Sequence, residues 1–213
     1  MEGIPGPGAH FYSNIVANSP FIKDFYREVV EEICAEATSG RVLDIGTGPG
    51  LIPLDIARSL PDVEVKAIDI SPAMVDIAVN HAINAGLSGQ VQFQCGSAEK
   101  IPFPDECFDL VLSTLSFHHW AKPVECLKEV LRVLKKGGEM WIYEIKWDLT
   151  QENKNQIRKK YGRALTFMVV NFVRMHSSLS ASRIQEVISL KELGYSEIVA
   201  EDKSAFVKLR LVK

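Results

Sequence analysis

The sequence has few cysteines, and no two of them are closely spaced. The four residues Cys34, Cys95, Cys107 and Cys126 include no C-x-x-C pair of the kind that binds zinc or cycles between thiol and disulfide. A disulfide framework is not expected either, because a chain of 213 residues is long enough to build a hydrophobic core. We therefore expect four reduced, buried thiols in a cytoplasmic protein.

Long hydrophobic runs and a charge excess are also missing. The longest apolar stretch, 165–173, contains Thr166 and Asn171 and is far shorter than the ~20 residues of a membrane-spanning helix. The opening residues Met1–Pro5 show no basic or apolar region of a secretory signal. Lys and Arg number 24 against 27 Asp and Glu, a net charge of −3. These observations predict no membrane span and no nucleic-acid partner, because no basic stripe for a phosphate backbone is indicated.

Apolar runs of strand length alternate with helical patterns along most of the chain. A first helix is expected from Pro20, capped by Ser19, because apolar residues recur every four positions from Phe21 to Ala37. Strands are expected at 41–45, 63–68, 91–95, 108–112, 140–145, 195–200 and 205–212, and further helices at 50–60, 71–86, 123–134 and 182–193. The fold predicted is α/β, a Rossmann-like doubly wound seven-stranded sheet. It is mostly parallel with a C-terminal antiparallel hairpin and has helices on both faces.

Glycines cluster where the first strand ends, in Gly46–Gly50. A dinucleotide-binding fingerprint would need a third glycine where Leu51 stands, and Asp44 would repel a diphosphate. Asp69 follows the second strand, 19 residues after the last glycine, where an acid can accept the hydroxyls of a ribose. The combination fits a cationic nucleoside better than a dinucleotide.

These features resemble the class I S-adenosylmethionine-dependent methyltransferases, in particular the small-molecule branch that includes the ubiquinone/menaquinone C-methyltransferases. The resemblance covers about 41–138: the stretch 96–109 is similar to the adenine-edge motif of the family, 108–113 to its fourth-strand motif, and 131–138 to the helix-to-strand turn beyond it. It implies an S-adenosylmethionine cofactor and methyl transfer by in-line displacement to a small-molecule acceptor.

The resemblance also implies which residues bind the cofactor. Asp44 would lie near the ammonium group, Asp69 at the ribose, and Ile70 and Met74 beside the adenine. The family usually has Asp where Ser97 stands, so the adenine contact would pass to the serine oxygen or to a neighbouring backbone N–H. The implied residues are Tyr12, Asp44, Gly46, Thr47, Gly48, Asp69, Ile70, Met74, Ser97, Ala98 and Ser113.

Candidate catalytic residues follow the fourth strand, at His118 and His119. His119 matches a histidine common in the resembling branch, and a neutral imidazole suits proton removal near pH 7. The alternative is that His119 bonds to the backbone and shapes the turn. No third ligand is suggested nearby, so we expect no metal.

The resemblance predicts one methyltransferase domain over 1–213. Its parts would be an N-terminal helix region at 1–40, the cofactor-binding core at 41–148, a substrate lid at 149–179, and a closing helix and hairpin at 180–213. The region 149–179 is basic and then apolar, which fits a lid over an apolar, partly anionic acceptor, or else a solvated basic helix followed by a core helix. Two other functions stay open: a non-catalytic module that binds adenosylmethionine, and an NAD-type dehydrogenase.

Overall fold

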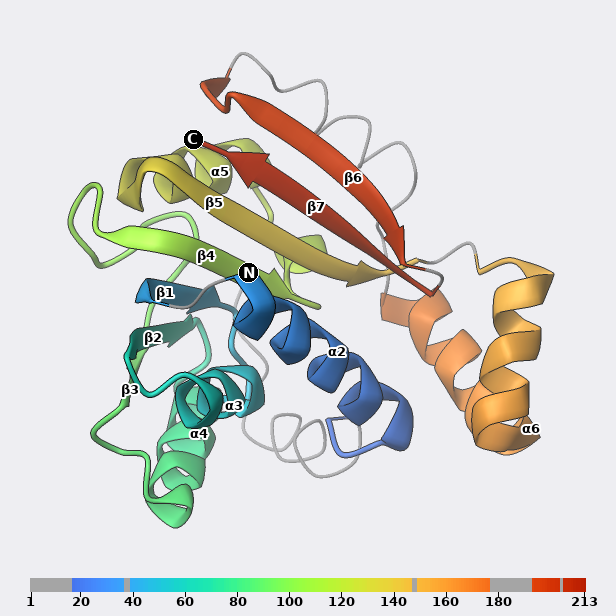
Figure 1. Cartoon of the computed structure of the whole chain (residues 1–213). Coiled ribbons are helices and arrows are strands. Elements are labelled where there is room, and N and C mark those ends of the chain that lie inside the picture. Colours follow the sequence, from blue (N-terminus) through green and yellow to red (C-terminus); the bar gives the residue numbers. More distant parts are fainter. Residues whose placement is uncertain (1–16, 37–38, 147–148, 177–192, 204) are drawn as a thin grey trace.

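A seven-stranded sheet with strand order β3-β2-β1-β4-β5-β7-β6 organises the protein (Figure 1). The computed structural model describes residues 17–36, 39–146, 149–176, 193–203 and 205–213. The strands are β1 (Gly40–Ile45), β2 (Val63–Asp69), β3 (Val91–Cys95), β4 (Phe108–Thr114), β5 (Leu134–Ile145), β6 (Glu197–Lys203) and β7 (Phe206–Val212). The helices are α2 (Pro20–Glu36), α3 (Leu51–Ser59), α4 (Pro72–Ala85), the short η2 (Phe117–His119), α5 (Pro123–Val133) and α6 (Gln151–His176).

Strands β3, β2, β1, β4 and β5 are parallel, and β7 is antiparallel to both β5 and β6. The predicted fold class is therefore confirmed. The largest boundary error is at β5, which begins at Leu134, where it pairs with Phe108, and not at Met140. The strand expected at 195–200 is also displaced, since β6 covers Glu197–Lys203. The glycine pair 137–138 was interpreted as a turn, but Gly138 lies against the backbone of β4, where a Cβ atom would be 3.0 Å from the Asp109 carbonyl oxygen. The glycine is thus needed for close approach of two strands.

Hydrophobic clusters cover both faces of the sheet. The predicted apolar stripe of α2 is buried at Phe21, Phe25, Val29 and Ile33, and the Phe25 ring stacks on Phe206 at 3.9 Å. The cluster on that face also includes residues of α3 and α4, whereas α5 supplies the cluster on the opposite face. The parallel strands therefore run between two apolar layers, and their carboxyl ends lie at one edge of the molecule (Figure 1).

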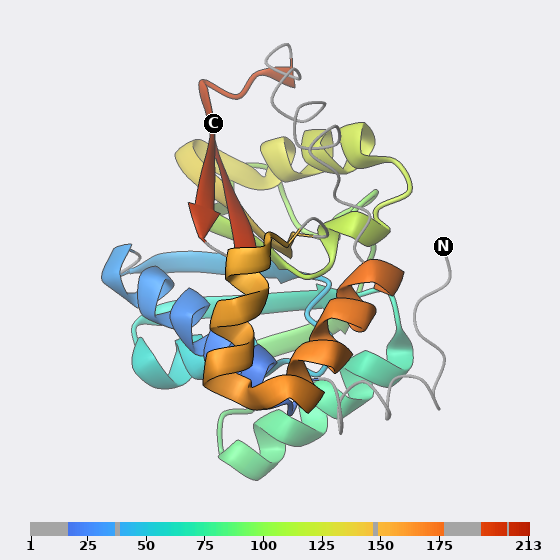
Figure 2. The same ribbon diagram turned by 90° about the vertical axis from the view of Figure 1, so that its right-hand side faces the viewer.

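Helix α6 lies beyond this edge (Figures 1 and 2). Gly162 interrupts it with φ 83° and ψ 171°, so that α6 folds into a hairpin of two helical arms. Near the bend, the Tyr161 hydroxyl donates a hydrogen bond to Asp24 of α2 at 2.6 Å. In the described residues, no helix is long and apolar enough to cross a membrane. The helix predicted at 182–193 lies outside the described residues, apart from its last position.

The cysteines differ from the expectation. All four are free thiols, but only Cys126 is buried; Cys34 and Cys107 are half-buried and Cys95 is exposed. Cys95 ends β3, an edge strand of the sheet, where one side has no neighbouring strand to cover it. A period-two pattern cannot tell an edge strand from a central one, which is why the burial of this thiol was predicted wrongly.

Candidate functional site

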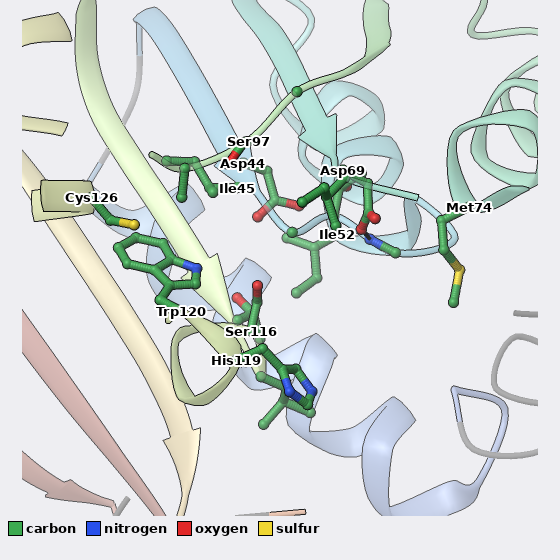
Figure 3. Close-up of a pocket in the computed structure, with 18 of the residues that line it drawn as sticks. Asp44, Ile45, Ile52, Asp69, Met74, Ser97, Ser116, His119, Trp120 and Cys126 are labelled. Atoms are coloured by element: carbon green, nitrogen blue, oxygen red, sulfur yellow. Dashed lines mark hydrogen bonds between the residues drawn. The ribbon is translucent and has the colours of Figure 1, made fainter. Parts of the chain in front are cut away.

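A pocket of about 400 Å³ opens at the carboxyl ends of the parallel strands (Figure 3). Most of the residues expected to bind a cofactor or act in catalysis line it. They are Asp44, Gly46, Thr47, Gly48, Asp69, Ile70, Met74, Ser97, Ala98 and His119. These residues come from the carboxyl ends of β1 and β2 and from the segments that follow β1, β2, β3 and β4. The parallel sheet thus brings together positions up to 75 residues apart in sequence, from Asp44 to His119.

Two expected residues in the described part of the chain do not line the pocket, and a third lies outside that part. Ser113 is fully buried inside β4, and its neighbour Thr114 lines the pocket instead, because successive side chains of a strand point to opposite sides. His118 is directed to Glu144. Tyr12 lies outside the described residues.

The glycine loop is packed too closely for side chains. Gly46 has φ 75°, and a Cβ atom on it would lie 1.9 Å from the Ser116 hydroxyl oxygen. Gly50 has φ 76° at the start of α3, and a Cβ there would lie 2.7 Å from the Phe93 ring. Positive φ and crowding together exclude other residues at both positions, which leaves the loop backbone facing the pocket.

Asp69 joins the glycine loop to the start of α4. One carboxylate oxygen accepts the Gly48 N–H at 2.8 Å, and the other accepts the Ser71 N–H at 2.8 Å. Burial raises the pKa of this carboxyl group, and the two backbone N–H groups oppose the rise. Each oxygen still has a lone pair, so the carboxylate can accept further hydrogen bonds from a ligand in the pocket.

Asp44 is a buried acid that points into the same pocket (Figure 3). Its side chain is 2% exposed, and its Oδ1 atom has no hydrogen-bond partner in the described residues. Burial raises the pKa of Asp44 to about 7, and the nearby charge of Asp69 adds to the rise, while the Thr47 hydroxyl opposes it. An unpartnered buried carboxylate is costly unless a donor or a positive charge reaches it. The site therefore fits a ligand with a cationic group at this point.

A glutamate of β5 holds His118, the first residue of the histidine pair His118–His119. The Glu144 carboxylate, 2% exposed, accepts the His118 backbone N–H at 3.1 Å and lies 2.9 Å from His118 Nδ1. The His119 ring lies 3.9 Å from the His118 ring, and His119 lines the pocket. Glu144 was not among the residues predicted from sequence, although it is a lone acid in the apolar run 140–145.

The rest of the wall is mostly apolar and was not identified from the sequence. It includes Tyr26 of α2, Ile52 of α3 and, after β4, Leu115 and Trp120. Leu115 has φ 53°, an uncommon conformation for a side chain of this kind, and its N–H donates to the Tyr143 carbonyl. This turn aims Ser116 at the glycine loop. No group of three or more metal-ligating side chains occurs in the part of the chain that the structure describes.

Comparison with known proteins shows which family and fold the chain is similar to. Residues 43–142 match the family model described as methyltransferase domain. The ubiquinone/menaquinone biosynthesis C-methyltransferase UbiE of Pseudomonas aeruginosa is 30% identical over 141 residues, which are 66% of this chain and 54% of that protein. The chain thus spans about half the length of the curated relatives it matches.

Solved structures share the fold. A structure from Methanococcus maripaludis, described as an S-adenosyl-L-methionine-dependent methyltransferase, superposes with a TM-score of 0.80 at 23% identity. The match covers 100% of this chain and 95% of that one. The [4+2]-cyclase SpnF superposes with a TM-score of 0.67 at 19% identity, covering 92% of this chain and 83% of that one. Proteins named for different reactions share this fold, so the fold alone does not identify the reaction.

Proposed function

From the resemblance of the chain to the class I S-adenosylmethionine-dependent methyltransferases, we propose that it transfers a methyl group from S-adenosylmethionine to a small-molecule acceptor. The observation that supports this most directly is the pair of acids in one pocket. Asp44 is buried with an unpartnered oxygen, and Asp69 is tied to the glycine loop beside it. A ligand with both a cationic group and a ribose would satisfy both acids.

The pocket offers a partner for each part of that ligand. Asp44 would hold the ammonium group and Asp69 the ribose hydroxyls. Ile70 and Met74 line the pocket beyond Asp69 and would contact the adenine. Ser97 and the Ala98 backbone N–H would meet the edge of the ring.

When bound, S-adenosylmethionine supplies an electrophilic methyl group on a sulfonium centre. The chain itself has to hold an acceptor in line with that group and keep water out, and correct positioning alone can supply several kcal/mol of the barrier. The apolar wall of Tyr26, Leu115 and Trp120 fits an apolar acceptor. His119 lies on the same wall and would accept a proton from an acceptor that must lose one.

The first experiment is calorimetric titration of the protein with S-adenosylmethionine, S-adenosylhomocysteine and NAD. We expect the two sulfur nucleosides to bind and NAD not to bind, because a diphosphate would meet Asp44. If neither sulfur nucleoside bound, the proposed function would be wrong. Binding of both without turnover on a panel of small-molecule acceptors would favour the non-catalytic module.

Asp69→Ala tests the assignment of the ribose acid. We expect at least about tenfold weaker binding of S-adenosylmethionine, because hydrogen bonds to a charged group contribute about 1.5–3 kcal/mol. Asp55→Ala is the matched control: Asp55 is an exposed acid on α3 that pairs with Arg58 three residues away. Unchanged affinity in a folded Asp69→Ala protein would remove Asp69 from the site.

A further inference from the structure

Positive charge is concentrated on α6. This helix carries six of the 24 Lys and Arg residues of the chain and only one of its 27 acidic residues, in a protein whose net charge is −3. Arg158, Lys159 and Arg163 are exposed, and none of the three forms an ion pair within the described ranges. Lys160, by contrast, is held by Asp24 at 2.8 Å. Within the described residues, three cations near the bend of the hairpin are thus unpaired.

The second arm of α6 exposes large apolar side chains close to one of these cations, Arg163. Phe167 is 72% exposed and Met168 is 56% exposed. Arg163 lies one helical turn before Phe167 and is on the same side of the arm. The opposite side is used by the protein itself, since Val169 is buried in the main hydrophobic cluster. The apolar residues that face solvent therefore have no packing role in the described part of the fold.

We propose that this α6 surface, defined by Arg158, Lys159, Arg163, Phe167 and Met168, docks on an anionic lipid bilayer. The cations complement anionic headgroups, and Phe167 and Met168 enter the boundary between headgroups and acyl chains, as in amphipathic helices that lie on membranes. A nucleic acid would satisfy the cations but would offer no apolar phase to Met168. The apolar pair therefore favours lipid.

The position of α6 determines where the pocket lies relative to the bilayer when α6 is docked. Helix α6 lies at the edge of the sheet where the parallel strands end, which is also the edge where the pocket opens (Figures 1 and 2). A docked α6 brings this edge toward the bilayer, from which an apolar acceptor can be taken. That last step rests on the proposed function, whereas the docking itself does not.

The test is co-sedimentation of the full chain with vesicles of phosphatidylcholine alone and of phosphatidylcholine mixed with phosphatidylglycerol. We expect binding to the anionic vesicles that weakens as salt is added. Arg163→Glu should lower the partition at least about fivefold, since each cation near an anionic surface contributes about that factor. Phe167→Ser combined with Met168→Ser should lower it at least about tenfold.

The matched control is Ile83→Ser. Ile83 is 58% exposed on α4, a helix without Lys or Arg, so this variant removes an equally exposed apolar group away from the charge. Its partition should equal that of the unchanged protein. The proposal is overturned if the protein fails to bind anionic vesicles, or binds both vesicle types equally. It is also overturned if Ile83→Ser lowers the partition as much as the Phe167 and Met168 variant does. Tighter binding to single-stranded RNA, or a dimer that the Phe167 and Met168 variant abolishes, would overturn it in favour of another partner. Titration of every variant with S-adenosylmethionine reports separately on the proposed function.

Discussion

Glu144 holds His118 with both oxygens of one carboxylate, one on the backbone N–H and one on the imidazole Nδ1. Glu144 is near the carboxyl end of β5, and His118 lies in η2, the short turn after β4. This contact fixes the turn from which His119 and Trp120 reach the pocket. A residue outside the pocket thereby determines the shape of its wall.

Glu144→Ala should therefore destabilise the protein. It removes the acceptor of the His118 backbone N–H and the partner of His118 Nδ1, both largely buried, and we expect a loss of about 2–4 kcal/mol in the free energy of unfolding. Glu144→Gln keeps an acceptor for the backbone N–H and should lose less. Urea unfolding measures both. Glu99→Ala is the control, because Glu99 is 39% exposed and its ion pair with Lys122 is long, at 3.8 Å. Equal stability of the Glu144→Ala and Glu99→Ala proteins would contradict the anchoring role.

The pKa of Asp44 predicts how cofactor binding depends on pH. Burial raises this pKa to about 7, and a cationic ligand binds the ionised form. Affinity for S-adenosylmethionine should therefore fall more than tenfold from pH 7 to pH 5, as Asp44 becomes protonated. Asp44→Asn should bind weakly at pH 7 and lose most of this dependence. A titration series over that range that is identical for the two proteins would exclude Asp44 as the ammonium partner.

The raised pKa of Asp44 also predicts how the stability of the ligand-free protein depends on pH. The folded pKa of Asp44 is raised above the unfolded value of about 3.9, so the folded protein holds a proton that the unfolded chain releases. Ionising Asp44 then costs stability, a cost that grows from about pH 4 to about pH 7 and stays at higher pH. Asp44→Asn should raise the Tm at pH 8 and leave it nearly unchanged at pH 4. A change in Tm that is the same at both pH values would contradict this pH dependence.

A comparison of alanine substitutions at two glycines distinguishes the cost of backbone strain from the cost of steric crowding. Gly46 and Gly86 have similar φ values, 75° and 70°, but a Cβ on Gly86 would meet no atom within 4 Å, while a Cβ on Gly46 would collide with Ser116. Gly86→Ala should cost about 1–2 kcal/mol for the left-handed conformation alone. Gly46→Ala should cost about 1–3 kcal/mol more and also weaken nucleoside binding. If the two variants lose the same free energy in urea unfolding, Ser116 can move away from the added methyl group without a measurable cost.

Thiol labelling tests the corrected placement of the cysteines. Cys95 is exposed, whereas Cys126 is buried and burial raises the pKa of its thiol to about 12. Ellman's reagent should modify Cys95 rapidly in the native protein and Cys126 only after unfolding, because the thiolate is the reactive form. Peptide mapping after a short reaction identifies the site. Rapid modification of Cys126 would contradict its burial.

Much of the site could be predicted from sequence because its residues stand at the ends of strands. Asp44 and Asp69 lie at the carboxyl ends of two short apolar runs, and Gly46 directly follows the first run; parallel strands bring these ends together. Tyr26 could not be found in this way. It belongs to α2, and only the packing of that helix over the sheet brings it to the pocket.

The interpretation of 149–179 shows the same limit. Composition indicated a basic segment followed by an apolar one but left open a lid or a core helix. The structure has one helix bent at Gly162, whose second arm buries Val169 and exposes Phe167. Hydropathy alone could not separate these two side chains, because it carries no information on which side of a helix packs against a neighbour.

The sequence by itself determined the order of the strands, the order of the helices before 149, the glycine loop and the two acids beside it, since each depends on local periodicity or on a short spacing. Only the tertiary structure decided that Glu144 holds His118, that Ser116 fills the space left by Gly46, and that Ser113 turns away from the pocket. These relationships join residues of different strands and loops, or depend on which side of β4 faces the pocket. Strand register and packing set both, and neither is encoded in any one segment of the chain.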